Sequence, residues 1–372
     1  MSTVKICDNI YYVGSEDFEV RMFHGYLVPF GTTYNAYLVL DEKITLIDYV
    51  KAPFAADLIA NIEKIVPLEK IDYMICNHIE PDHSGALPVI AERIPNVPIY
   101  ATAAAGRGLK QYYKKEFNIV PVKKGDSLCT GKYHFQFVPM PMVHWPDSMS
   151  TYLVEEGILF SNDAFGQHLA TKERFDDEIG LERLLERAGN YYANIVLPFG
   201  PQVSKVLADT ADLDIQMICP SHGVILRKYI PEMVEKYKKW ANNESDEDKA
   251  VIVFDTMWGS TRMLAEQIAK DFENRGVHAK VIDLAEKHIS EAISDALESR
   301  YIAVGSPTLN RNMMPSVAAF LTYLKGLAPK KRVGLAFGSY GWSGESIPQV
   351  EAILRDECGY EMMDSVKAVY RP

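Results

Sequence analysis

The sequence has no apolar run long enough to span a bilayer, and its first residues, MSTVKICDNIYYVG, hold no apolar core or small-residue cleavage site. We therefore expect a cytoplasmic protein without a membrane anchor. Positive charge is in deficit, because 39 Lys and Arg stand against 50 Asp and Glu and the formal net charge is -11. Such a chain repels nucleic acid and anionic lipid, so neither is an expected partner.

Cysteine is also scarce. The five cysteines are single and widely spaced, which excludes a disulfide framework and a thiolate metal site; they are Cys7, Cys76, Cys129, Cys219 and Cys358. Internal repeats and low-complexity segments are absent as well. With 48% apolar and 24% charged residues, the 372-residue chain has the composition of a globular protein with room for two domains.

A polar, acidic run, ANNESDEDKA (residues 241–250), is interpreted as the linker between two domains, which we place at residues 1–248 and 249–372. Before it, short apolar runs alternate with helical patterns, which indicates layered sheets flanked by helices. The runs are NAYLVL, ITLID, YMICN, PIYAT, FQFVPM, TYLVEEGILFSND, NIVLPFG and IQMICPS. After it, five runs alternate with helical stretches and predict a doubly wound parallel sheet: AVIVFD, AKVIDL, YIAVGS, RVGLAFGS and VKAVYR.

Metal-competent side chains follow the predicted strands of the first domain. They are His78, Glu80, Asp82 and His83 in CNHIEPDHSG, then His144, Asp163 and His222 after later strands. Donors that follow separate strands can converge at one end of a sheet. Positions 78, 80 and 82 alternate, and Pro81 disfavours a helical residue at 80. We therefore expect an extended segment that sends all three side chains to one side.

Four imidazoles and three carboxylates suffice for two divalent ions, and a bridging hydroxide would bring the charge close to zero. Imidazole with a large share of carboxylate and no thiolate suits iron or manganese at least as well as zinc. A lone histidine after a strand is more often a hydrogen-bonded structural residue. We place His134 and His168 in that class.

The order His-x-Glu-x-Asp-His, then His144, Asp163 and His222, resembles the metallo-β-lactamase superfamily, whose usual second histidine is Glu80 here. This replacement is the pattern of the flavodiiron proteins, or A-type flavoproteins, which hold two irons. The resemblance implies an αββα sandwich with one iron on His78, Glu80 and His144, the other on Asp82, His83 and His222, and Asp163 as the bridge. His24 and Tyr191 match positions near the family's iron site, and ordinary packing is the equally good alternative for both.

The second domain has three polar loops after predicted strands. The first, DTMWGSTR, precedes a helix and offers hydroxyls and backbone N–H groups to a phosphate. No lysine follows and no Gly-x-Gly-x-x-Gly motif is present, which favours a monophosphate. The other loops are SPTLNRNMMP (306–315) and GSYGWSGE (338–345), and ligands of doubly wound sheets bind where such loops meet.

These loops resemble the FMN-binding pattern of flavodoxin as it occurs in flavodiiron proteins. The implied contacts include three aromatic rings that can lie against a flavin, and Asn310, which can bond to its polar edge, although a single tryptophan is more often a packing residue. The full set is Thr256, Met257, Trp258, Gly259, Ser260, Thr261, Pro307, Thr308, Leu309, Asn310, Ser339, Tyr340, Gly341, Trp342 and Gly344. A flavodoxin has a helix after its fifth strand, and none is seen after VKAVYRP, so we expect either that one face of this sheet is partly uncovered or that another element covers it.

The resemblance implies an oxidoreductase that reduces O2 to water, NO to N2O, or both, with electrons passed through FMN from an external donor such as rubredoxin. It also implies a head-to-tail homodimer, or a dimer of such dimers, in which the FMN of one subunit faces the irons of the other. One alternative is a zinc hydrolase of the β-lactamase fold with a flavodoxin-like tail, and another is an electron carrier whose metal domain is structural. Glu80 and the FMN loops oppose the hydrolase, because hydrolysis does not use a flavin.

Overall fold

The computed structural model describes residues 3–372, which form two compact units. The first unit comprises the residues up to Met22, Val28–Tyr191 and Gln202–Glu235, and the second comprises Phe23–Leu27, Tyr192–Pro201 and Lys236–Pro372. The chain therefore passes between the units at several places, and the division at residue 248 stays a proposal. Among the described residues, no helix is both long enough and apolar enough to cross a bilayer.

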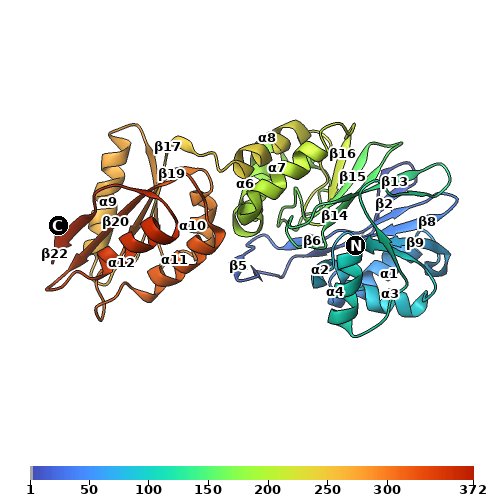
Figure 1. The fold of residues 1–372 in the computed structure, drawn as a ribbon, viewed down its shortest axis with the longest axis horizontal. Helices are drawn as coiled ribbons and strands as arrows, with labels where there is room; N and C mark the ends of the chain where they lie inside the picture. Colours follow the sequence, from blue (N-terminus) through green and yellow to red (C-terminus); the bar gives the residue numbers. More distant parts are fainter. Residues whose placement is uncertain (1–2) are drawn as a thin grey trace. The chain divides into compact units, whose positions relative to one another are not determined.

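Two sheets form the centre of the first unit (Figure 1). The seven-stranded sheet has the order β1(Val4–Cys7), β2(Ile10–Tyr12), β7(Tyr37–Val39), β8(Ile44–Ile47), β9(Ile71–Ile75), β10(Ile99–Thr102), β11(Ile119–Val122). The five-stranded sheet has the order β12(Ser127–Cys129), β13(His134–Pro139), β14(Met149–Leu153), β15(Ile158–Asn162), β16(Met217–Pro220). A short pair, β3(Ser15–Asp17) and β6(Thr32–Tyr34), lies outside both sheets.

The two sheets share one buried core. Alternate residues of the facing strands supply it, and the ring centroids of Tyr37 and Phe160 are 5.1 Å apart across the interface. Helices α1(Ala55–Glu63), α3(Leu87–Arg93) and α4(Ala103–Tyr113) lie on the side of the seven-stranded sheet, and α6(Leu181–Tyr191) and α7(Gly200–Asp209) on the other (Figure 1). On α6, Leu184, Ala188 and Tyr191 are buried at helical spacing. This is the predicted αββα sandwich.

The second unit is a doubly wound parallel sheet, as predicted. Its strands have the order β18(His278–Asp283), β17(Asp246–Phe254), β19(Ser299–Gly305), β20(Val333–Tyr340), with β21(Glu361–Met362) and β22(Val366–Val369) both on β20. The helices are α9(Ser260–Glu273), α10(Ile289–Ala296), α11(Pro315–Leu327) and α12(Ser346–Ala352). Helix α9 contacts β17, β18, β20 and β22, and Phe337 and Ala368 beneath that face are buried. At these positions the face is therefore covered, which agrees with the second of the two alternatives that the sequence left open.

Two further expectations fail for identifiable reasons. Residues 246–250, which were predicted to belong to the linker, begin strand β17. Their acidic side chains are exposed, as in a linker, but their backbone pairs with β19. The apolar run NIVLPFG, read as a strand, lies in a π-helical turn (Tyr192–Val196) and a 3-10 turn (Leu197–Phe199). A short run that is buried on all sides carries no period, so its sequence does not separate helix from strand.

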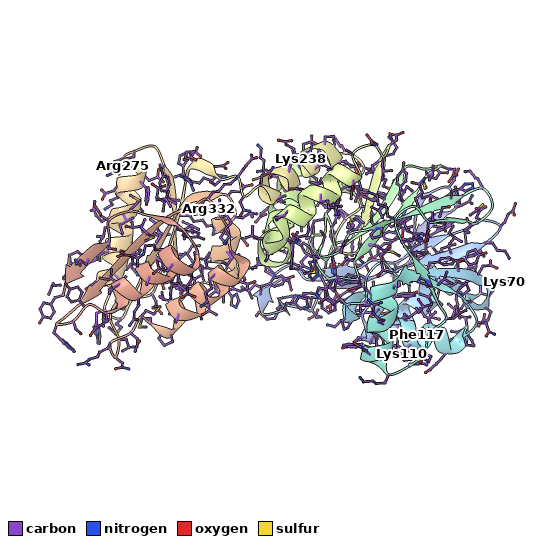
Figure 2. The ribbon with its side chains drawn as sticks, viewed as in Figure 1. Lys70, Lys110, Phe117, Lys238, Arg275 and Arg332 are labelled. Carbon is purple, nitrogen blue, oxygen red and sulfur yellow. The ribbon has the colours of Figure 1, made fainter. Side chains whose placement is uncertain are left out.

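The segment between α8(Ile230–Ala241) and β17 is hydrogen-bonded to a buried arginine, Arg332, which is labelled in Figure 2. The guanidinium of Arg332 donates to the backbone carbonyls of Asn243, Lys330 and Leu297. Burial lowers its pKa to about 10, still far above neutrality. Residues 242–245 are thus held by the second unit.

Candidate metal and flavin sites

Seven side chains from four loops converge in the first unit, and we call them the donor cluster. His78 and Glu80 follow β9, and Asp82 and His83 lie in the short helix α2(Pro81–Ser84). His144 lies between β13 and β14, Asp163 directly follows β15, and His222 follows β16. All seven are buried.

The sequence predicted an extended backbone for residues 78–83, but the structure is extended in only part of this segment. Glu80 has extended dihedral angles, but Pro81 begins a helix, because its fixed φ and missing N–H suit the first helical position. This bend divides the segment. His78 and Glu80 lie with His144 and Asp163, whereas Asp82 and His83 lie with His222.

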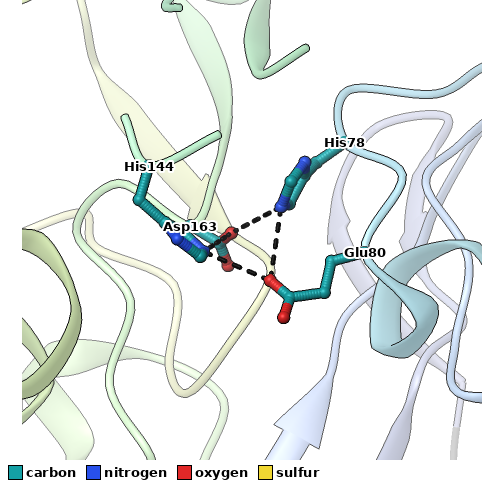
Figure 3. Close-up of side chains that lie close together, drawn as sticks. All are labelled: His78, Glu80, His144 and Asp163. Carbon is teal, nitrogen blue, oxygen red and sulfur yellow. Dashed lines mark hydrogen bonds and ion pairs between the residues drawn. The ribbon is translucent and has the colours of Figure 1, made fainter. Parts of the chain in front are cut away.

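The first half of the donor cluster is His78, Glu80 and His144 (Figure 3). Nε2 of His78 and Nε2 of His144 lie 3.4 and 3.2 Å from Oε2 of Glu80. The same two nitrogens lie 3.6 and 3.3 Å from Oδ2 of Asp163. One ligand atom from each of the four residues lies within 4.8 Å of the others, which is the spacing of atoms around a single ion.

The second half is Asp82, His83 and His222. Oδ2 of Asp82 lies 3.1 Å from Nε2 of His222 and 3.5 Å from Nε2 of His83. Nε2 of His83 is also 3.0 Å from Oδ1 of Asp163. Asp163 therefore presents one carboxylate oxygen to each half.

Unsatisfied polar atoms show that the cluster fits metal ions. Both carboxylate oxygens of Asp82 and Asp163, and both ring nitrogens of His83, are buried without a hydrogen bond of good geometry to any residue among 3–372. Buried polar atoms are nearly always satisfied, so a missing partner in a cluster of N and O donors points to cations. Two ions, one per half with Asp163 between them, would satisfy the two oxygens of Asp163, Oδ2 of Asp82 and Nε2 of His83.

The electrostatics agree. Burial lowers the pKa of His78 and His144, but nearby carboxylates outweigh it and raise each pKa to about 10: Asp147 and Glu80 for the first, Asp163 and Glu80 for the second. Burial would raise the pKa of Asp163, yet the neighbouring His83 and His144 hold it well below its usual range. The carboxylates thus hold positive charge on the imidazoles, and metal ions would replace those protons.

Two side chains beside the second half complete the surroundings. The ring of Tyr191 is centred 6.0 Å from that of His222, and His168 lies 5.0 Å from Tyr191 and 4.9 Å from His222. His168, which we placed in the structural class, is thus next to the donor cluster. His134 is exposed and pairs with Glu155, as a structural residue would.

The remaining predicted residue near the iron site, His24, belongs to the second unit. It is exposed, and its ring is 4.5 Å from that of Phe23 and 6.5 Å from that of Tyr26. Its predicted role stays a prediction.

Asp147 also contacts the donor cluster, and it was not predicted from the sequence as a site residue. Its carboxylate oxygen Oδ2 lies 2.9 Å from Nδ1 of His78 and accepts the backbone N–H of Ile79 at 3.0 Å. The available signal was its position three residues after His144, but a carboxylate outside the donor motif has no distinctive spacing.

The three loops of the predicted flavin site lie side by side in the second unit, because β17, β19 and β20 are adjacent and parallel. Thr261 Oγ1 is 2.9 Å from Ser339 Oγ, which joins the first loop to the third. The backbone N–H of Thr308 donates to the carbonyl of Ser339 at 3.1 Å, which joins the second to the third. All predicted FMN contacts therefore lie on one edge of the sheet.

The chemistry of this edge fits a flavin monophosphate. Helix α9 begins at Ser260 and presents its first N–H groups to the loop. Gly259 has φ of +85° and open space where a side chain would be, so an anion can approach. Trp258 and Trp342 are 93% and 92% exposed, an unfavourable state for two indoles that a stacked ring would relieve.

Comparisons with known proteins agree with this geometry. Residues 32–223 match the ODP family beta lactamase model, and residues 252–367 match the flavodoxin model. A nitric oxide reductase of Moorella thermoacetica is 43% identical over 357 residues, which cover 95% of this chain and 89% of that protein. The structure of rubredoxin oxygen:oxidoreductase from Desulfovibrio gigas superimposes with a TM-score of 0.96 at 39% identity, covering 100% of this chain and 94% of that one. The flavodiiron protein from Giardia intestinalis gives 0.97 at 34% identity, covering 100% and 92%.

Proposed function

This chain belongs to the flavodiiron proteins, and from that premise we propose that it is an oxidoreductase that reduces NO to N2O, O2 to water, or both. The observation that carries the proposal is Asp163, whose two carboxylate oxygens face the two halves of one buried donor cluster. Glu80 supplies a carboxylate to the first half, which suits iron. Related proteins named nitric oxide reductase and rubredoxin oxygen:oxidoreductase support both substrates.

The side chains have distinct roles in this proposal. His78, Glu80 and His144 would hold one iron, Asp82, His83 and His222 would hold the other, and Asp163 would offer one carboxylate oxygen to each. The loops at residues 256–261, 306–310 and 339–344 would hold FMN, and the N–H groups at the start of α9 would be available to its phosphate. When bound, two ferrous ions and a reduced flavin would supply the four electrons needed to convert O2 to two waters, or the two needed to convert two NO to N2O and water.

The chain's own residues order the substrate. The buried loops around the cluster exclude bulk water from a small diatomic molecule. We assign Tyr191 a place beside the bound molecule, because its ring lies against His222 and His168. We assign His24 the same role on the strength of its match to the family position.

Electrons come from an external donor, for which we propose rubredoxin or a similar carrier, supported by the name of the Desulfovibrio gigas protein. The working assembly is a head-to-tail homodimer, which places the flavin of one subunit against the irons of its partner. Unpaired cysteines, such as Cys129 on the surface, agree with a cytoplasmic location.

The test is to reduce the purified protein anaerobically with reduced rubredoxin and follow the loss of NO and of O2 separately. We expect two irons and one FMN per chain, rapid loss of at least one substrate, and no peroxide. Two zinc ions with esterase activity would identify the hydrolase instead. Slow oxidation by O2 with release of peroxide would identify an electron carrier.

A further inference from the structure

In each half of the donor cluster, one histidine makes a hydrogen bond through Nδ1, while its Nε2 lies within the cluster. Nδ1 of His78 lies 2.9 Å from Oδ2 of Asp147, and Nδ1 of His222 lies 2.6 Å from the carbonyl oxygen of Thr33. Because both of these oxygens only accept hydrogen bonds, each Nδ1 donates, and an ion that replaces the proton on Nε2 would find the lone pair of that nitrogen facing the cluster. The acceptors differ in charge: the one behind His78 is an anion, and the one behind His222 is neutral.

Asp147 is fixed in place. It is 2% exposed, and besides His78 it accepts the backbone N–H of Ile79, while its own carbonyl accepts the hydroxyl of Thr102 at 2.9 Å. It does not belong to either group of donors. Since β9 and β14 belong to different sheets, the bond between His78 and Asp147 also joins the loops of the two sheets.

The charge behind His78 changes what its ring can do. An imidazole that donates to a carboxylate is more basic, and gives more electron density to a metal, than one that donates to a carbonyl. More electron density at the ion stabilises its higher oxidation state. The two halves of the cluster are therefore unequal by construction, even though each has two imidazoles.

We propose that Asp147 is a positioning residue that makes the half formed by His78, Glu80 and His144 the tighter iron site and favours its ferric state. The proposal rests on the proposed diiron function, because it requires iron in the donor cluster. Asp147 acts through His78 and touches neither iron nor substrate.

The first test compares variants by anaerobic titration of the metal-free protein with ferrous iron against a competing chelator. Asp147→Asn keeps the size of the side chain and removes its charge. We expect the tighter of the two binding constants to weaken about 10- to 100-fold and the weaker one to stay unchanged. Thr102→Val is the matched control, because it removes a bond to the same loop and leaves the carboxylate, and both constants should stay as they were. No weakening in Asp147→Asn, or equal weakening of both constants, overturns the proposal.

The second test needs no change at Asp147, so it holds even if that variant fails to fold. The ring of Trp145 lies 5.1 Å from that of His78 and 6.2 Å from that of His144. The first equivalent of ferrous iron should therefore quench Trp145 fluorescence and the second should add little, with Trp145→Phe as the blank. If the second equivalent causes the quenching, the order of the sites is wrong.

Oxidation state is read by Mössbauer spectroscopy of half-oxidised protein that received isotopically enriched iron as the first equivalent. We expect the enriched iron to be ferric, and a ferrous signal overturns that part of the proposal. An unsubstituted protein that binds no iron would overturn the diiron function itself. Two irons bound with equal affinity would overturn only the inference about Asp147.

Discussion

At the scale of single residues, the main feature is that the two oxygens of the Asp163 carboxylate face different halves of the donor cluster. Oδ1 of Asp163 faces His83 and His222, and Oδ2 faces His78 and His144. An amide of the same shape has only one oxygen and no charge. A single change of the side chain at position 163 therefore affects both halves.

Asp163→Asn should accordingly lower the affinity for both irons by more than about 100-fold. This exceeds the loss that is typical when the changed residue only hydrogen-bonds to a metal ligand. Metal analysis after gel filtration should find well below one iron per chain. Asp176→Asn is a suitable control, because Asp176 is also a buried carboxylate but accepts backbone N–H groups of Arg227, Lys228 and Tyr229. If Asp163→Asn retains two irons, Asp163 does not bridge them.

The sequence could predict the donors but not their supports. Metal-competent residues directly after apolar runs, such as His78 after YMICN, indicate convergence at strand ends, and the structure groups all seven in two sets. That they ligate iron stays a prediction. Asp147 and His168 contact donors of the cluster from loops distant in sequence, and the spacing in a single sequence contains no information on such contacts.

At the scale of secondary-structure elements, the sequence was informative within most strands and less so at the residues where a helix or strand begins. Most strands are short apolar runs rich in β-branched and aromatic residues, and they were predicted. Pro81 was read only for its effect on Glu80, whereas it also begins a helix. The start of β17 at Asp246 was not predicted, because the exposed acidic residues at the beginning of this strand have the same composition as a linker.

The loop before α9 offers a test of the flavin site. Gly259→Ala should weaken FMN binding about fivefold to tenfold, because a side chain at φ of +85° costs about 1 kcal/mol. Gly276→Ala is a matched control, since Gly276 also has positive φ, +76°, and open space, but lies in the turn after α9. Titration of flavin-free protein by flavin fluorescence measures both. Equal weakening in the two variants would show that strain in α9, rather than the loop, controls binding.

The end of α8 is held by Glu298, which accepts from Lys236 at 2.6 Å, Trp240 Nε1 at 3.0 Å and Lys249 at 3.1 Å. Glu298→Gln should lower the free energy of unfolding by about 2 kcal/mol at neutral pH, because these charge-assisted bonds are lost or weakened. Urea unfolding followed by Trp240 fluorescence measures the loss. The exposed Glu361→Gln should leave it unchanged.

The same contacts set a pH dependence. Burial would raise the pKa of Glu298, but the bonds from Lys236 and Trp240 outweigh it and lower the pKa from 4.5 to about 2. Because the folded pKa is depressed, the stabilisation is complete above pH 4.5 and is lost as pH falls toward about 2. The difference between Glu298→Gln and the unsubstituted protein should therefore shrink as pH is lowered from 4.5. A constant difference over that range would contradict this assignment.

At the scale of the whole molecule, the proposed dimer can be tested by mixing two inactive variants. Asp163→Asn loses its irons, and Gly259→Glu puts a carboxylate where the phosphate should bind. If the flavin of one subunit serves the irons of its partner, co-expression should restore about a quarter of full activity, because half of the dimers are mixed and each has one complete pair. Electron transfer within a single chain predicts almost no recovery.

The route of the chain between its two units has a practical consequence for protein engineering. Segments 23–27 and 192–201 belong to the flavin-binding unit although they are encoded within the other one. The hydroxyl of Tyr323 on α11, for example, donates to Asn194 at 2.8 Å. A foreign flavodoxin spliced on after residue 248 would lack these complementary surfaces. Chimaeras that exchange this module should therefore transplant all three of its chain segments together.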